Sequence, residues 1–308
     1  MQKGVCRGGQ TPYFLRSANY WSFPPEVTMK YRKMYAVTAL AVFFAACALT
    51  VSCGDGGMAG VDSGRHGEFL PPAPEGETWE LIWSDEFEGE QLDRSLWETP
   101  VGVRRKGFWA EEDSYLDGEG NLVLRTRETD GKYYSGAIRT RGGFEHRFGY
   151  WVARCMFHTE VGHWPAFWLF SSPGVTRVGD EGRDGTEIDI MEKSTAKEDK
   201  INHALHWDGY GEQHQSEAQY VSVPGLSWGW HTFGLYWTPE EYVFYVDGVE
   251  TWRTSAGGVS QVPAYVKLTD EVDEWGGDIS EARLPDYFLV DYVRVYDYDG
   301  GGIGRTVP

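Results

Sequence analysis

The chain has 308 residues, with 47 acidic and 28 basic side chains and a formal net charge of −19. Residues 1–53 hold six basic residues and one acid, so residues 54–308 carry 22 basic and 46 acidic residues, a net charge of −24. A body this acidic repels phosphate backbones and anionic lipid headgroups over roughly 10 Å. This excludes nucleic acid as a partner and disfavours polyanionic substrates.

Tryptophan is unusually abundant, with 14 residues, of which 13 follow residue 78. The flat indole ring suits the apolar C–H face of a sugar ring, so the excess is compatible with carbohydrate binding. Filling of a hydrophobic core explains it equally well.

Residues 29–53 have the pattern of an export signal. Residues 29–33 form a basic cluster, residues 34–51 contain no charge, and the small residues Ser52, Cys53 and Gly54 follow. This order predicts a secretory signal that begins at Met29, although eighteen uncharged residues could also remain as a membrane anchor.

The residues before Cys53 decide among these alternatives. Thr50-Val51-Ser52-Cys53 resembles a bacterial lipobox, although Thr50 departs from the aliphatic residue usual at that position. The resemblance implies cleavage before Cys53 and lipidation of this residue. We therefore expect a lipid-anchored protein of the bacterial cell surface or periplasm, with simple secretion as the alternative.

The rest of the chain divides by composition. Residues 54–75 are rich in Gly and Pro and predict a flexible linker, residues 76–300 the folded domain, and residues 301–308 a tail. Cys155 is the only cysteine after Cys53, which excludes a disulfide within the domain. We expect it to be a small buried apolar residue.

From residue 79 onward the sequence predicts short strands and no helix longer than two turns. Clear examples are residues 121–127, 148–157, 231–237, 242–246, 249–254 and 287–296. Asp247-Gly248 is a typical two-residue hairpin turn between two of these segments. This spacing predicts an all-β sandwich of two sheets.

Residues 187–192, Glu-Ile-Asp-Ile-Met-Glu, place three carboxylates in six residues. Side chains alternate along a strand, so Glu187 and Asp189 share one face while Ile188 packs on the other. Glu192 joins that face only if a β-bulge adds one residue at Ile190 or Met191. A solvated acidic edge strand is the alternative, but the apolar residues between the acids favour a central strand.

The bulged arrangement has the dimensions of a glycosidase site. Two Cα atoms four strand steps apart are separated by about 13 Å, and two inward-pointing Glu side chains leave about 5 Å between their carboxyl groups. This is the separation at which one carboxylate attacks an anomeric carbon while the other protonates the leaving oxygen, with net retention. Asp189 between them would raise a neighbour's pKa by like-charge repulsion and could share a proton.

The segment 187–192 resembles the bulged signature of glycoside hydrolase family 16, the laminarinase-like and agarase-like endo-β-glycanases. Other segments are similar to the family too, and together they cover about residues 79–299. They are residues 83–87, 135–140, 148–154, 164–169 and 290–296.

This resemblance implies a concanavalin-like β-jelly roll, a sandwich of two antiparallel sheets with a substrate cleft on the concave face. Glu187 would be the nucleophile, Glu192 the general acid/base and Asp189 the residue that assists the nucleophile. No cofactor would be required for catalysis.

The resemblance also suggests residues around the reacting groups. Trp164 and Trp168 fall where the family has cleft aromatics, and Asp291 falls where a structural calcium ion often binds. We expect His206 on the strand next to the catalytic one, either bonded to Asp189 or substrate or buried as a structural residue. Trp109 and Arg105 lie in a loop that tends to approach the cleft, where the basic residues 104–106 meet an acidic substituent or only balance the acids at 111–113.

The substrate expected first is a neutral β-1,3-glucan or mixed β-1,3/1,4-glucan, cleaved internally by a monomer. Endo-β-galactosidase action on agar-like galactans or mucin-type O-glycans is the alternative. A non-catalytic glycan-binding protein would be expected to lack one of the acids, and all three are present. Transglycosylation would use the same residues as hydrolysis.

Overall fold

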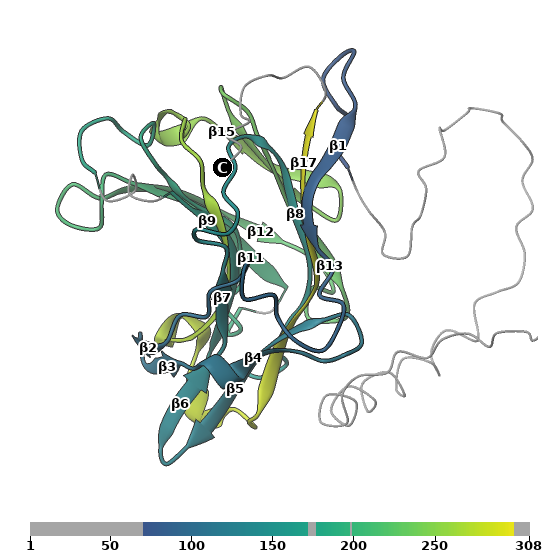
Figure 1. Cartoon of the computed structure of the whole chain (residues 1–308). Coiled ribbons are helices and arrows are strands. Elements are labelled where there is room, and N and C mark those ends of the chain that lie inside the picture. Colours follow the sequence, from purple (N-terminus) through teal and green to yellow (C-terminus); the bar gives the residue numbers. More distant parts are fainter. Residues whose placement is uncertain (1–69, 172–176, 198, 299–308) are drawn as a thin grey trace, which may run out of the picture. The chain divides into compact units, whose positions relative to one another are not determined.

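The computed structural model describes residues 70–171, 177–197 and 199–298 (Figure 1). The export signal, Cys53, most of the linker and the tail lie outside these residues. In the described part, no helix is long and apolar enough to span a bilayer. Its helical segments are single 3₁₀ turns: η1 (Glu111–Asp113), η3 (Ala256–Gly258), η4 (Glu274–Gly276) and η5 (Ile279–Glu281).

The domain consists of two β-sheets that face each other (Figure 1). The six-stranded inner sheet has the order β12 (Gln215–Ser222), β11 (Lys200–Trp207), β10 (Glu187–Glu192), β9 (His163–Phe170), β16 (Tyr265–Val272) and β7 (Ala137–Arg139). All its pairings are antiparallel, and β10 is central.

The eleven-stranded outer sheet has the order β15 (Val249–Thr254), β14 (Tyr242–Val246), β13 (His231–Trp237), β8 (Gly149–Met156), β17 (Asp286–Tyr298), β5 (Leu122–Thr129), β6 (Lys132–Ser135), β3 (Gly107–Trp109) and β2 (Gly102–Arg104). In addition, β1 (Trp79–Asp85) pairs with β17, and β4 (Ser114–Leu116) pairs with β5. Its pairings are antiparallel except that of β3 with β6. The all-β sandwich expected from the sequence is confirmed.

Local sequence explains the strand boundaries. Strands β13, β14 and β15 coincide with the predicted segments, and the turn residues Asp247 and Gly248 have φ of 48° and 75°. Both values lie in the left-handed region that a type I′ hairpin turn requires, which Asp and Gly tolerate best.

The core lies between the sheets and is made by alternate residues of each strand. Strand β10 contributes Ile188, Ile190 and Met191, and its neighbour β9 contributes Phe167 and Leu169. The outer sheet contributes the fully buried residues Trp151, Ala153, Cys155, Phe233, Leu235, Val293 and Val295. Cys155 is thus a buried apolar residue, as expected. Three tryptophans, Trp97, Trp151 and Trp237, are fully buried, so part of the tryptophan excess fills the core.

We predict that shortening a leucine side chain lowers the free energy of unfolding much more in this core than at the surface. Leu268 in β16 has no exposed surface, and Leu81 in β1 is 48% exposed. Leu268→Ala should lower the free energy of unfolding by about 2–5 kcal/mol, and Leu81→Ala by less than about 1 kcal/mol. Guanidinium denaturation of both variants measures the difference, and equal losses would contradict this description of the core.

Candidate active site

A β-bulge in β10 brings the three acids to one side of the inner sheet. Along β10 from Asp189 to Glu192 there are three steps, while the paired residues of β11, Ala204 and Asn202, are two steps apart. The pairing with β9 shifts between Asp189 and Met191, which places the extra residue at Ile190. Glu187, Asp189 and Glu192 consequently line the same cleft.

Glu192 is 8% exposed and is held by two donors. Trp164 Nε1 donates to Oε1 at 2.9 Å, and Asn202 Nδ2 donates to Oε2 at 2.9 Å. Burial raises the pKa of Glu192 to about 7, and the charge of Glu187 adds to this rise, while the hydrogen bonds from Asn202 and Trp164 oppose it. A carboxyl group with this pKa can give and take a proton near neutral pH.

Glu187 accepts a hydrogen bond from the hydroxyl of Tyr210, which lies in the loop between β11 and β12. Burial raises the pKa of Glu187, and the Tyr210 hydroxyl and the charge of Lys267 act in the opposite direction. Tyr210 also stacks on His214, at 5.9 Å between ring centroids. The nucleophile candidate therefore has a donor that its own strand does not supply.

Asp189 lies between the two glutamates and is 3% exposed. Its Oδ2 forms no hydrogen bond with the described residues, and His206 Nε2 is 3.5 Å away. Burial and the charges of Glu192 and Glu187 raise the pKa of Asp189 well above its ordinary value. A protonated Asp189 can donate a hydrogen bond to a neighbouring carboxylate, which fits a role beside the nucleophile.

His206 pairs with Glu187 across the strands and lines the cleft. Its Nδ1 is 2.9 Å from His214 Nε2, and burial together with His214 lowers the pKa of His206 to about 4. His206 is therefore neutral at pH 7. His206 is half-buried, and its ring bonds to His214 and not to Asp189, so its contact with substrate stays a prediction.

The cleft has a volume of about 240 Å³. Its lining includes Trp164, which is half-buried, and Trp168, which is 5% exposed and donates to Thr269 Oγ1 at 3.0 Å. Trp164 thus presents more surface to a sugar than Trp168 does. The full lining is Arg104, Arg105, Trp164, Ala166, Trp168, Glu187, Asp189, Glu192, His206, Tyr210, His214, Thr269 and Glu271.

Basic side chains reach the cleft but are already engaged. Glu271 accepts from Arg104 Nε at 2.6 Å and from Arg105 Nε at 2.8 Å, and the Arg105 guanidinium lies 4.6 Å from the Trp164 ring centroid. Lys267 Nζ lies 3.4 Å from the Trp168 ring centroid, and burial lowers the pKa of Lys267 to about 7.

Trp109 does not line the cleft. Its indole donates to the carbonyl oxygen of Asp270 at 2.9 Å, and the Arg104 guanidinium lies 4.9 Å from its ring centroid. Trp109 is half-buried, and its contact with substrate stays a prediction.

Several site residues were not expected from the sequence: Asn202, Tyr210, His214, Lys267 and Glu271. Lys267 and Glu271 had a detectable signal, because they are charged residues four positions apart, and so on one face, of the strand-like segment 265–272. Tyr210 and His214 had none, since they lie in an irregular loop.

Asp291, the residue expected to bind calcium, forms an ion pair with Arg154. Asp291 Oδ2 accepts from Arg154 Nη1 at 2.5 Å, and a guanidinium at this distance would repel a cation. Asp291 also belongs to neither of the two side-chain groups of the described residues that could hold a metal. These residues do not favour calcium there, and the calcium site stays an untested prediction.

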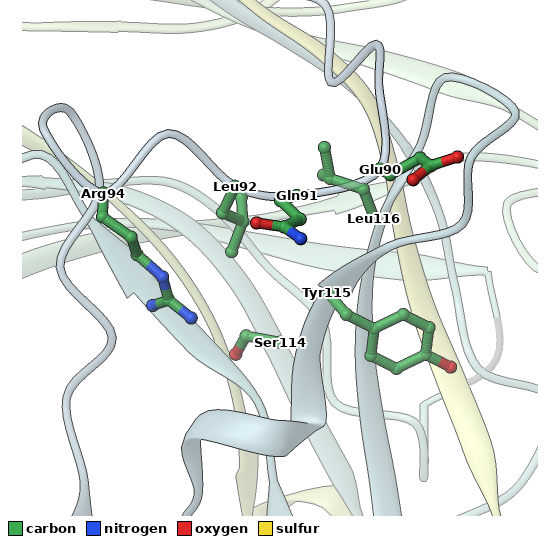
Figure 2. Close-up of a pocket in the computed structure, with 7 residues that line it drawn as sticks. All are labelled: Glu90, Gln91, Leu92, Arg94, Ser114, Tyr115 and Leu116. Atoms are coloured by element: carbon green, nitrogen blue, oxygen red, sulfur yellow. The ribbon is translucent and has the colours of Figure 1, made fainter.

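The structure has a second hollow, which is shown in Figure 2. It is lined by Glu90, Gln91, Leu92, Arg94, Ser114, Tyr115 and Leu116, none of which lines the cleft. Its single carboxylate has no partner acid among these residues, so the cleft at β10 is the candidate active site.

Comparisons with known proteins agree with this geometry. Residues 105–291 match the family described as glycosyl hydrolases family 16. A keratan-sulfate endo-1,4-β-galactosidase of Sphingobacterium multivorum is 30% identical over 235 residues, which cover 71% of this chain and 55% of that protein. A β-glucanase of Rhodothermus marinus is 28% identical over 250 residues, which cover 71% of this chain and 85% of that protein.

The structure of an endo-β-1,3-glucanase from Pyrococcus furiosus is similar to this fold. It superimposes with a TM-score of 0.61 at 28% identity, covering 73% of this chain and 97% of that chain. The chain thus spans little more than half of the keratan-sulfate endo-1,4-β-galactosidase. It spans most of the Rhodothermus marinus β-glucanase and of the Pyrococcus furiosus structure.

We predict a bell-shaped pH dependence of kcat/KM if Glu187 attacks and Glu192 protonates. The rate should fall as pH rises through about 7, because Glu192 then loses the proton it must donate. It should fall on the acid side when Glu187 becomes protonated. A rate that is still rising at pH 9 would contradict the assignment of Glu192.

We predict that Tyr210→Phe shifts the acid limb of this profile to higher pH, because it removes the donor that lowers the pKa of Glu187. The alkaline limb should move little, since Glu192 has other donors. Tyr220→Phe is the matched control, because Tyr220 is exposed on β12 and its hydroxyl contacts Lys197. Equal profiles for wild type and Tyr210→Phe would exclude this role of Tyr210.

Proposed function

Because the chain belongs to family 16 of the glycosyl hydrolases, we propose that it cleaves internal β-glycosidic bonds of a glycan with retention of configuration. The family and the jelly-roll fold expected from the sequence are both confirmed. The observation that carries the proposal is the pair Glu187 and Glu192, which line one cleft on either side of the bulge.

The proposed reaction has two steps. Glu187 attacks the anomeric carbon, and Glu192 gives its proton to the departing glycosidic oxygen, which leaves a covalent glycosyl-enzyme. Glu192, now ionised, takes a proton from water as the water attacks the same carbon and releases Glu187. Tyr210 orients Glu187, and a protonated Asp189 stabilises the charge on the nucleophile.

A neutral β-1,3-glucan or mixed β-1,3/1,4-glucan is the proposed substrate. Glu271 balances part of the charge of Arg104 and Arg105, and Lys267 lies against an indole face. The cleft thus offers stacking surfaces and few unengaged charges, which suits an uncharged sugar chain. Similarity to β-glucanases, one of which this chain covers at 85% of its length, supports the same choice.

A β-galactosyl glycan, as in agar-like or mucin-type chains, is the second candidate. Arg105 favours it, because this guanidinium lies over Trp164 with its side chain 42% exposed and could meet an anionic substituent. Similarity to the keratan-sulfate endo-1,4-β-galactosidase supports this alternative.

We also propose that the protein is exported and held at the bacterial surface by a lipid on Cys53, as a monomer. The basic cluster, uncharged segment and lipobox-like residues support the proposal. Mass spectrometry of the native N-terminus tests it, and an unmodified peptide that covers Cys53 would refute the anchor.

We predict that Glu187→Gln lowers turnover by roughly 10³-fold or more while leaving folding and glycan binding intact, because an amide cannot replace the attacking carboxylate. Wild type and variant are incubated with laminarin, mixed-linkage β-glucan, agarose and mucin O-glycans, and products are analysed by mass spectrometry. Gluco-oligosaccharides from wild type alone would support the first substrate, and galactose-containing products alone the second.

The matched control for this experiment is Glu217→Gln. Glu217 is exposed on β12 and lines no part of the cleft, so this variant should retain full activity. Substantial cleavage by Glu187→Gln would refute the nucleophile assignment. Glu192→Gln should also lose most of its turnover. Azide should restore turnover only on substrates that have good leaving groups, because the glycosyl-enzyme can still form there.

A further inference from the structure

Lys267 is a buried cation on the cleft side of the inner sheet. It alternates with Thr269 and Glu271 along β16, and both of these line the cleft, so the three side chains share one face. Trp168, the partner of Lys267 on β9, lines the cleft as well. Only 7% of Lys267 is exposed.

The ammonium group of Lys267 has no polar partner among the described residues. Its Nζ forms neither a hydrogen bond nor an ion pair with any of them. Its contacts are with aromatic rings, whose centroids are 3.4 Å away for Trp168, 5.4 Å for Phe170 and 5.9 Å for Trp109. The ammonium thus lies over one face of the Trp168 ring.

A buried charge without a hydrogen-bond acceptor is costly, and the aromatic contacts offset part of this cost. Because Nζ of Lys267 has no partner and is still not one of the fully enclosed polar atoms without one, it keeps contact with solvent. The neighbouring arginines differ, since Arg104 pairs with Glu271 and Arg139 pairs with Glu98. Lys267 therefore offers free donors to a ligand.

The strand register places Lys267 in line with the catalytic acids. Partners in antiparallel strands point to the same face, and Asp189, Trp168 and Lys267 are successive partners across β10, β9 and β16. Glu187 and Glu192 lie on either side of Asp189 along β10. A glycan whose scissile bond is flanked by these two acids runs across the strands, along this row.

Lys267 lies beyond the sugar unit that reacts. Two interstrand spacings, about 10 Å, separate it from Asp189, which is more than one pyranose ring spans. In the other direction the row continues with Ala204 on β11 and Ala218 on β12, which have no polar side-chain atom. A hydrogen-bond donor along this row is therefore found on the β16 side.

We propose that Lys267 is a specificity-determining residue that donates hydrogen bonds to hydroxyl groups of a sugar unit next to the reacting one. This inference rests on the proposed function. The unit is uncharged, because the charges of Glu187 and Glu271 already act on Lys267 and would repel an acidic substituent. It is held by hydrogen bonds, since the ammonium occupies the ring face of Trp168 on which a sugar would stack.

Lys267→Met tests the proposal, because methionine keeps an apolar stem against Trp168 and removes the donors. The measured quantity is kcat/KM for laminari-oligosaccharides of two to six units. If wild type releases only galactose-containing products, oligosaccharides of that kind and of the same lengths replace them. Wild type should exceed the variant by less than about twofold on the shortest oligosaccharide cleaved, and by about tenfold or more on the longest.

The dependence on length separates this role from others. A charge that acted only on Glu187, or a distorted cleft, would change kcat/KM equally for every length, and that result would overturn the proposal. Lys132→Met is the matched control, because Lys132 is exposed on β6 with its ammonium 5.7 Å from the Phe108 ring centroid, outside the cleft lining. It should match wild type at all lengths.

Thermal unfolding separates binding from a structural role. Lys267→Met should have a Tm equal to or above that of wild type, because it removes a buried charge that has no partner. A large fall in Tm, or failure to fold, would make Lys267 a structural residue and overturn the proposal.

A third measurement leaves Lys267 unchanged. Burial lowers its pKa to about 7, so its neutral amine should react with acetic anhydride at pH 7.5. In Glu192→Gln, which consumes little ligand, the six-unit oligosaccharide should slow acetylation of Lys267 but not of Lys132. Equal acetylation of Lys267 with and without the oligosaccharide would overturn the proposal.

Failure of this inference can be distinguished from failure of the proposed function. If wild type cleaves the oligosaccharides and Lys267→Met lowers kcat/KM equally at all lengths or not at all, only the role of Lys267 is refuted. If wild type cleaves none of the glycans or oligosaccharides, the proposed function fails and this inference fails with it.

Discussion

The active site depends on the β-bulge at Ile190, because this one residue decides on which face of the inner sheet Glu192 lies. Without it, strict alternation would turn Glu192 toward the core and leave Glu187 without a partner. The bulge also explains why Ile190 and Met191, adjacent in sequence, are both fully buried in the core. The same local irregularity thus fills the core on one side of the sheet and completes the acid pair on the other.

The three carboxyl groups have different environments, which is the basis of the different roles that we propose for them. Burial raises the pKa of each, but the neighbours differ: Tyr210 opposes the rise at Glu187, Asn202 and Trp164 oppose it at Glu192, and Asp189 Oδ2 has no hydrogen bond from the described residues. Groups whose pKa values are separated in this way can act as carboxylate, acid and proton holder at one pH. The three donors, Trp164, Asn202 and Tyr210, come from three segments of the chain, so the pKa values of the acids depend on the folded sheet.

The sequence was sufficient for the features that depend on local pattern. Strand alternation, the Asp247-Gly248 turn and the burial of Cys155 follow from neighbouring residues, and the bulge follows from the spacing of the acids. The sequence was insufficient to predict contacts between residues that are far apart along the chain. Asp270 contacts His163 across 107 residues, and Glu271 contacts Arg104 across 167 residues. Trp109 shows the same limit, because its indole donates to the carbonyl oxygen of Asp270 in β16, 161 residues further along the chain.

Strand β12 has a consequence for how the molecule moves. It forms an edge of the inner sheet, pairs with β11 alone, and has seven of its eight residues exposed. Backbone hydrogen bonds hold it with little apolar burial, and such a segment opens locally at a small free-energy cost, with fast amide hydrogen exchange. The loop before it carries Tyr210 and His214, so we expect each opening of β12 to loosen the hydrogen bond from Tyr210 to Glu187 while β9, β10 and β16 stay paired. The pKa of Glu187, the proposed nucleophile, would then vary with the local opening of this edge strand.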